Sequence, residues 1–220
     1  MGGGAMKVVF VNPERCIGCR QCEFACAVEH SASKSETAAW LEEPTPRTRI
    51  HVEPGQVAGT SFPSRCRHCD PAPCQQVCPT SAITRDDEHD VVLVDAQTCI
   101  NCAMCAMVCP FDALTFHPMP AGADVRTVAV KCDGCIDRIR RGETPACAEV
   151  CKVDAIVYGE LNDLVAQGRL HESGVVLAAV SAAAASEEAV GPGPVASWRA
   201  WGVDVTRLEA AATTAEGGPR

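Results

Sequence analysis

Short apolar runs alternate with polar turns over residues 1–160 of this chain. The runs at residues 7–12 and 155–160 have the length and the β-branched content of strands. Between them lie two pairs of shorter apolar segments, and a polar or Pro/Gly turn within each pair predicts a hairpin. These pairs are residues 81–84 with 91–95 and residues 113–117 with 125–130. The pattern therefore predicts an α+β domain of small elements over residues 1–160.

Two other segments have a different character. Residues 27–65 form a long insertion, in which residues 45–52 alternate like an edge strand and residues 31–41 favour a short helix. After the domain, residues 161–185 predict a helix. Residues 186–220 mix Gly, Pro, Ala and Thr, which predicts a flexible tail.

Composition adds an acidic balance and many cysteines. The 220 residues carry a formal net charge of -9, are only 4% aromatic, and include 16 cysteines. The negative charge argues against a nucleic-acid partner, because nucleic-acid-binding surfaces are basic. No apolar run is long enough for a membrane span and the first residues lack an apolar signal core, so we expect a cytoplasmic protein with no direct membrane span. Thiols stay reduced in that compartment, which favours metal binding over disulfides.

The cysteines fall into four groups of four. Groups one and three have the spacing Cys-x2-Cys-x2-Cys-x3-Cys of bacterial ferredoxins, whereas groups two and four have longer central gaps. In chain order, the groups are Cys16, Cys19, Cys22 and Cys26; Cys66, Cys69, Cys74 and Cys78; Cys99, Cys102, Cys105 and Cys109; and Cys132, Cys135, Cys147 and Cys151. In ferredoxins with two clusters, three thiolates of a group hold one cluster and the fourth ligates the other. Four groups therefore predict four 4Fe-4S clusters, with the groups working in pairs.

Zinc is the competing interpretation for group four alone, because two separated cysteine pairs are also typical of zinc sites. Groups one and three crowd four cysteines into one loop, which suits a cluster better than a single tetrahedral ion. Disulfides would require an oxidising compartment.

With these motifs, residues 7–160 resemble the iron-sulfur beta subunits of the dimethyl sulfoxide reductase superfamily. Residues 16–31, Cys66-Arg-His-Cys69 and Lys131-Cys132-Asp-Gly-Cys135 are most similar to its CooF/HycB-like branch. The resemblance implies two fused ferredoxin-like modules of the bacterial dicluster type, with pseudo-twofold cluster pairing.

The resemblance also implies how the groups share their clusters. Groups one and four pair, groups two and three pair, and the last cysteine of each group completes the ligand set of its partner group. The implied sets are set 1 (Cys16, Cys19, Cys22 and Cys151), set 2 (Cys66, Cys69, Cys74 and Cys109), set 3 (Cys99, Cys102, Cys105 and Cys78) and set 4 (Cys132, Cys135, Cys147 and Cys26).

No catalytic constellation is evident outside the cysteine groups, because the six histidines are scattered and no P-loop or dinucleotide motif is present. The resemblance implies a non-catalytic subunit that relays single electrons through four clusters, between a catalytic oxidoreductase subunit and a redox acceptor. The catalytic partner would be a molybdenum, tungsten or nickel enzyme, of the carbon monoxide dehydrogenase, formate dehydrogenase, hydrogenase or aldehyde oxidoreductase type. A free polyferredoxin carrier is the alternative, but the insertion and the tail favour docking.

Three expectations concern residues beside the cysteines. Lys152 stands where groups two and three have proline, and its charge would raise the potential of the neighbouring cluster unless it points into solvent. Met104 and Met107 are expected to pack against cluster sulfur. A solvated edge is favoured over a docking face or a positive potential beside a cluster for four basic residues, Arg47, Arg49, Arg65 and Arg67.

Overall fold

The computed structural model describes residues 7–55, 57, 59–121 and 124–190. The chain divides into two compact units, Met1–Leu164 and Val165–Arg220. All sixteen cysteines belong to the first unit.

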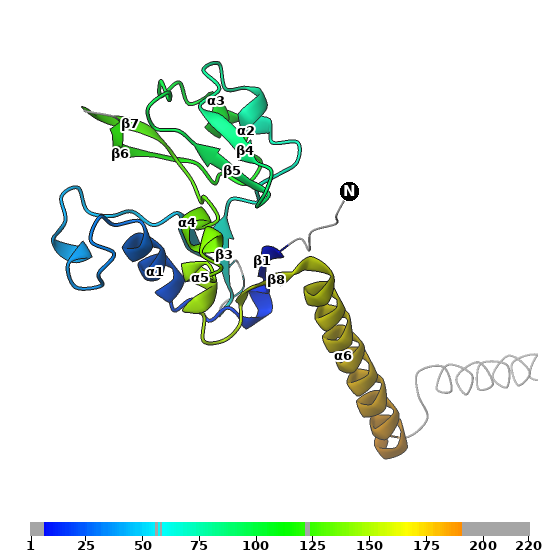
Figure 1. The fold of residues 1–220 in the computed structure, drawn as a ribbon. Coiled ribbons are helices and arrows are strands. Elements are labelled where there is room, and N and C mark those ends of the chain that lie inside the picture. The colour runs from blue at the N-terminus through cyan, green and yellow to red at the C-terminus, as the bar shows by residue number, and fades with distance from the viewer. Residues whose placement is uncertain (1–6, 56, 58, 122–123, 191–220) are drawn as a thin grey trace, which may run out of the picture. The chain divides into compact units, whose positions relative to one another are not determined.

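Strands of the first unit form two-stranded antiparallel sheets (Figure 1). β1 (Lys7–Val11) pairs with β8 (Ile156–Glu160), so the first and last strands of the unit meet. This pairing places the group one loop, which follows β1, next to the group four loop, which precedes β8. The other pairs are β2 (Ile50–Pro54) with β3 (Ser61–Arg65), β4 (Ile83–Asp86) with β5 (Val91–Val94), and β6 (Thr115–Ala121) with β7 (Asp124–Val130).

Short helices follow the cysteine loops. The longest in the cysteine-bearing region is α1 (Gln21–Glu29). The others are α2 (Pro73–Gln76), α3 (Met104–Met107), α4 (Ile136–Arg140) and α5 (Ala146–Glu149). The residues directly before α1, α3 and α4 have left-handed backbone conformations, with φ of 59° at Arg20, 61° at Ala103 and 54° at Cys135. Because a positive φ reverses the local direction of the backbone, the chain turns from loop to helix within one residue.

Cysteine and small aliphatic side chains fill the interior of the first unit. Two groups of buried residues mix these types. The first contains Cys22, Cys26, Ile50, Val52, Cys147 and Ile156, and the second contains Ala72, Ile83, Val92, Cys105, Leu114 and Ala129. Sulfur therefore occupies interior positions in a chain with few large rings.

The insertion differs from its prediction in two places. Residues 31–41 do not form the predicted helix and contain only a 3-10 turn, Ala39–Leu41. The carboxylate of Glu42 accepts the N–H groups of Ala32 at 3.0 Å and Ser33 at 2.7 Å, so a side chain replaces helical partners there. The strand β2 begins at Ile50 rather than at residue 45.

The helix α6 (Leu161–Val190) begins in the first unit and continues into the second. It starts at the first residue of the predicted helix, Leu161. It also includes residues 186–190, for which the sequence predicts a flexible tail instead. The remainder of that tail, residues 191–220, lies outside the described residues. None of the helices in the described ranges combines the length and the apolar content needed to cross a membrane.

Candidate iron-sulfur sites

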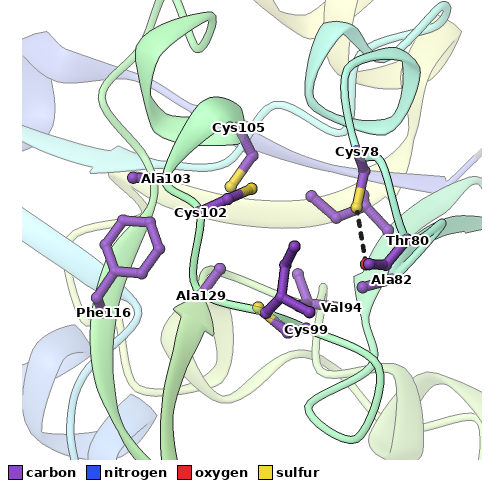
Figure 2. A pocket seen from close by; sticks show the side chains of 12 residues that line it. Cys78, Thr80, Ala82, Val94, Cys99, Cys102, Ala103, Cys105, Phe116 and Ala129 are labelled. Carbon is purple, nitrogen blue, oxygen red and sulfur yellow. Dashed lines mark hydrogen bonds between the residues drawn. The ribbon is translucent and has the colours of Figure 1, made fainter.

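The four thiols assigned to set 3 surround one small cavity (Figure 2). Cys78, Cys99, Cys102 and Cys105 all line this cavity. Three of them come from group three, whereas Cys78 comes from the segment that follows α2. The hydroxyl of Thr80 lies 3.7 Å from Cys78 Sγ.

A second cavity brings together the thiols of set 2. It is lined by Cys66, Cys69, Cys74 and Cys109, together with His68 and Lys131. Cys109 belongs to group three, so groups two and three exchange their last cysteines in space. The His68 ring accepts the N–H of Val92 through Nδ1 at 3.0 Å, and burial lowers the pKa of this imidazole to about 3. A neutral His68 therefore carries its proton on Nε2.

The thiols of set 1 gather where α1 lies beside α5 (Figure 1). Cys22 is buried close to Cys19 and Cys151, and burial raises the pKa of its thiol to about 12. Cys16 packs against the same buried group of residues. Cys151 belongs to group four, so the exchange of last cysteines recurs here.

Set 4 includes Cys26 from α1 and Cys147 from α5, which are buried in the same group of residues as Cys22. Burial raises the pKa of Cys135 to about 12, and Cys132 and Cys26 are neighbours that raise it further. Burial and the same two neighbours also raise the pKa of Cys147. Cys26 comes from α1, so group four does not gather its own four cysteines. That arrangement does not match a zinc site built from group four alone.

Backbone N–H groups point at several of these sulfur atoms. The N–H of His68 donates to Cys66 Sγ at 3.4 Å, and the N–H of Gly134 donates to Cys132 Sγ at 3.4 Å. In the insertion, the N–H of Arg49 donates to Cys26 Sγ at 3.3 Å. Hydrogen bonds to sulfur favour the thiolate and tune the potential of a bound cluster.

Asp133, between the first two cysteines of group four, joins α1 to the insertion. Its carboxylate accepts hydrogen bonds from Arg49 Nη1 at 2.6 Å and from His30 Nε2 at 3.1 Å. Burial opposes ionisation of Asp133, but His30 and Arg49 hold its pKa well below the usual value. Burial likewise opposes a charge on His30, yet its bonds to Asp133 and Cys26 raise the imidazole pKa to about 10. A charged network therefore lies beside the Cys26 thiol.

The donor sets fit iron-sulfur clusters. Each set presents four thiols, which are the ligands of 4Fe-4S clusters. The raised pKa values of Cys22 and Cys135 mean that thiolates at these buried positions need a neighbouring cation. Iron meets this need, because metal ions deprotonate the thiols that bind them.

Comparison with known proteins agrees with this chemistry. Residues 57–161 match the family model of the 4Fe-4S dicluster domain, and residues 7–28 match that of a 4Fe-4S binding domain. The chain is 41% identical over 161 residues to an iron-sulfur protein of Rhodospirillum rubrum, with 70% of this chain and 83% of that protein covered. The chain belongs to the family of 4Fe-4S dicluster proteins.

Two other members of the 4Fe-4S dicluster family are named for electron transfer. The thiosulfate reductase electron transfer subunit PhsB of Salmonella typhi is 36% identical, with 71% of this chain and 77% of that protein covered. The electron transport protein HydN of Escherichia coli strain K12 is also 36% identical, with 72% and 90% covered. The predicted 4Fe-4S cofactor and the resemblance to reductase iron-sulfur subunits are confirmed, and sixteen cysteines are consistent with four clusters. The CooF/HycB-like branch stays a prediction.

Two of the basic residues occupy positions that the sequence interpretation missed. Arg65 is 7% exposed, and Arg49 is half-buried on Asp133, so the solvated-edge interpretation is wrong for both. Arg47 and Arg67 are exposed, as that interpretation expects. Lys131, which received no role, is only 4% exposed. Arg65 and Lys131 directly precede the first cysteines of groups two and four, which is a signal that the sequence did contain.

Other residues beside the cysteines face outward. Met107 is 84% exposed, so its expected packing against cluster sulfur is wrong. Met104 is 45% exposed. Lys152 is exposed as well, which agrees with the interpretation that it points into solvent.

Proposed function

We propose that this chain is a non-catalytic relay subunit, in which single electrons pass through four 4Fe-4S clusters between a catalytic oxidoreductase subunit and a redox acceptor. Sets 1 to 4 hold the clusters, and each bound cluster supplies one-electron redox chemistry. The observation that carries this proposal is the serial contact between the sets.

The contacts give an order of the sets. Sets 3 and 2 adjoin through the exchanged Cys78 and Cys109. Sets 2 and 4 adjoin at Cys66 and Cys132, which share one buried group of residues. Sets 4 and 1 adjoin because Cys26 of set 4 and Cys22 of set 1 share one buried group of residues, against which Cys151 packs. The order 3–2–4–1 therefore supports a linear path.

The two ends of this order are the more accessible sites. Among the sixteen cysteines, only Cys102 of set 3 and Cys19 of set 1 are exposed. Exposed apolar side chains accompany them, with Ile100 and Met107 near set 3 and Ile17 near set 1. Apolar surface around an accessible site is suited to contact with a partner protein. Electrons would enter at one end and leave at the other.

The partner class follows from the relatives and from the sequence resemblance. A reductase of the thiosulfate type is one candidate, since PhsB is the electron transfer subunit of such an enzyme. Carbon monoxide dehydrogenase, formate dehydrogenase, hydrogenase and aldehyde oxidoreductase types, with molybdenum, tungsten or nickel, are the others. The relay interpretation is favoured over a free polyferredoxin carrier because both end sets lie beside exposed apolar residues.

Anaerobic co-purification tests the proposal. The tagged chain should contain about sixteen iron atoms and retain a large catalytic subunit. Met107→Glu should weaken that retention about tenfold without changing the iron content. Val125→Glu, at a position that is also exposed but lies on β7, is the matched control and should leave retention unchanged. A monomer with four reducible clusters and no partner would instead support the free carrier.

A further inference from the structure

Two buried cations, Arg65 and Lys131, lie at the junction of sets 2 and 4. Arg65 donates through Nη2 to the carbonyl of Val9 at 2.8 Å and through Nη1 to the carbonyl of Cys66 at 3.1 Å. Lys131 donates through Nζ to the carbonyl of Cys132 at 3.0 Å and to that of Val92. Among the described residues, neither cation has a carboxylate partner.

The two side chains cross between the sets. Lys131 directly precedes Cys132, a residue of set 4, yet it lines the cavity of set 2. Arg65 directly precedes Cys66, a residue of set 2, yet its Nη1 lies 3.7 Å from Cys132 Sγ of set 4. Each cation is therefore adjacent in sequence to a cysteine of one set, whereas its side chain lies beside the other set.

Buried charges need counter-charges, because an unpaired ion loses its hydration without compensation. Carbonyl oxygens accept hydrogen bonds from Arg65 and Lys131 but do not neutralise them, and Arg65 Nε has no hydrogen-bond partner among the described residues. The thiols of sets 2 and 4, which lie beside Lys131 and Arg65, become anionic when they bind a cluster. Their negative charge grows by one when a bound cluster is reduced, so a buried cation favours the reduced state.

We infer that Lys131 and Arg65 are crossed counter-charges, with Lys131 raising the potential of the cluster held by set 2 and Arg65 raising that of the cluster held by set 4. The inference rests on the ligand sets of the proposed function. It assigns to these two residues the tuning of the inner sites, where an electron crosses between the two pairs of groups.

Redox titration monitored by electron paramagnetic resonance tests this assignment on the full chain, purified anaerobically. Lys131→Gln and Arg65→Gln remove the charge but keep an amide donor. Each should lower the potential of one cluster by about 59 mV, which is a tenfold change in its ratio of reduced to oxidised forms for one electron. The two variants should affect different clusters. Lys131→Arg and Arg65→Lys should restore the potentials.

Matched controls separate this role from the effect of any nearby cation. Arg67 flanks Cys66 on the opposite side from Arg65 but is exposed, and Lys152 follows Cys151 but is exposed. Arg67→Gln and Lys152→Gln should produce much smaller shifts, because solvent screens their charges. Equal shifts in the controls and in the buried variants would overturn the inference.

A second background identifies the cluster that each cation affects. In Cys74→Ser, which disrupts set 2, the effect of Lys131→Gln should disappear and that of Arg65→Gln should remain. The reverse pattern, or a shift of the same cluster by both variants, contradicts the crossing. If a Gln variant loses its iron, the charge-keeping variant must retain it, or the counter-charge role is wrong. Fewer than about sixteen iron atoms in the unaltered chain would refute the proposed ligand sets instead.

Discussion

The guanidinium of Arg49 donates a 2.6 Å hydrogen bond to the carboxylate of Asp133, across the boundary between the insertion and the group four loop. The backbone N–H of Arg49 also reaches Cys26 Sγ at 3.3 Å. The insertion is thus tied both to a group one cysteine and to the group four loop, and it contributes to the environment of set 4.

Replacing Arg49 should weaken this tie. In Arg49→Met, the half-buried Asp133 loses a charged donor, which costs roughly 1–3 kcal/mol. We expect the cluster of set 4 to be lost at a lower temperature than in the unaltered chain. An anaerobic thermal scan that follows the bleaching of cluster absorbance measures this change. Arg47→Met removes an exposed arginine of the same insertion and should leave the bleaching temperature unchanged. Equal bleaching of both variants would show that Asp133 does not depend on Arg49.

The exchanged cysteines lead to a prediction that the linear sequence does not suggest. Cys109 belongs to group three by sequence but lines the cavity of set 2. Cys109→Ser should therefore perturb the cluster of set 2 and spare that of set 3, whereas Cys78→Ser should do the reverse. The two variants should differ in which signal changes in electron paramagnetic resonance spectra. The same altered signal in both would mean that the groups do not exchange ligands.

The sequence predicts much of this arrangement because spacing and apolar runs are local properties. The strands predicted at residues 7–12 and 155–160 correspond to β1 and β8, and the cysteines of each set lie near one another, although their division into ligand sets stays a prediction. The burial of Arg65 and Lys131 was not predicted, because it depends on how the sets pack together. The turn structure of residues 31–41 was missed for a related reason, since the Glu42 carboxylate binds Ala32 and Ser33 from outside that segment.

Iron removal should unfold the first unit. Its interior contains buried cysteines such as Cys22, Cys26 and Cys147 in place of large apolar side chains. Without metal, these thiols provide few stabilising contacts, and binding energy of the metal is folding energy in such domains. Anaerobic chelation should abolish protease resistance over residues 7–160, and reconstitution with iron and sulfide should restore it. Unchanged resistance after chelation would show that aliphatic packing alone maintains the fold.

The hydroxyl of Thr80 offers the most local test of how the chain tunes a cluster. It lies 3.7 Å from Cys78 Sγ (Figure 2). Partial burial opposes ionisation of this thiol, but the hydroxyl and nearby backbone N–H groups together lower its pKa below the usual value. A donor to the thiolate stabilises the more negative reduced cluster. Thr80→Val keeps the shape but removes the donor, and should lower the potential of the set 3 cluster by roughly 20–60 mV, the equivalent of one hydrogen bond for a one-electron couple.

Thr98 provides the matched control for Thr80→Val, since it adjoins Cys99 of the same set but donates its hydroxyl to Asp95 at 3.0 Å. Thr98→Val should leave the potential of the set 3 cluster unchanged in the same titration. Equal shifts in both variants would mean that loss of a nearby hydroxyl dipole, rather than the bond to Cys78, sets the effect. A shift confined to Thr80→Val would assign the tuning to that bond, because the two variants differ in the acceptor that the hydroxyl reaches.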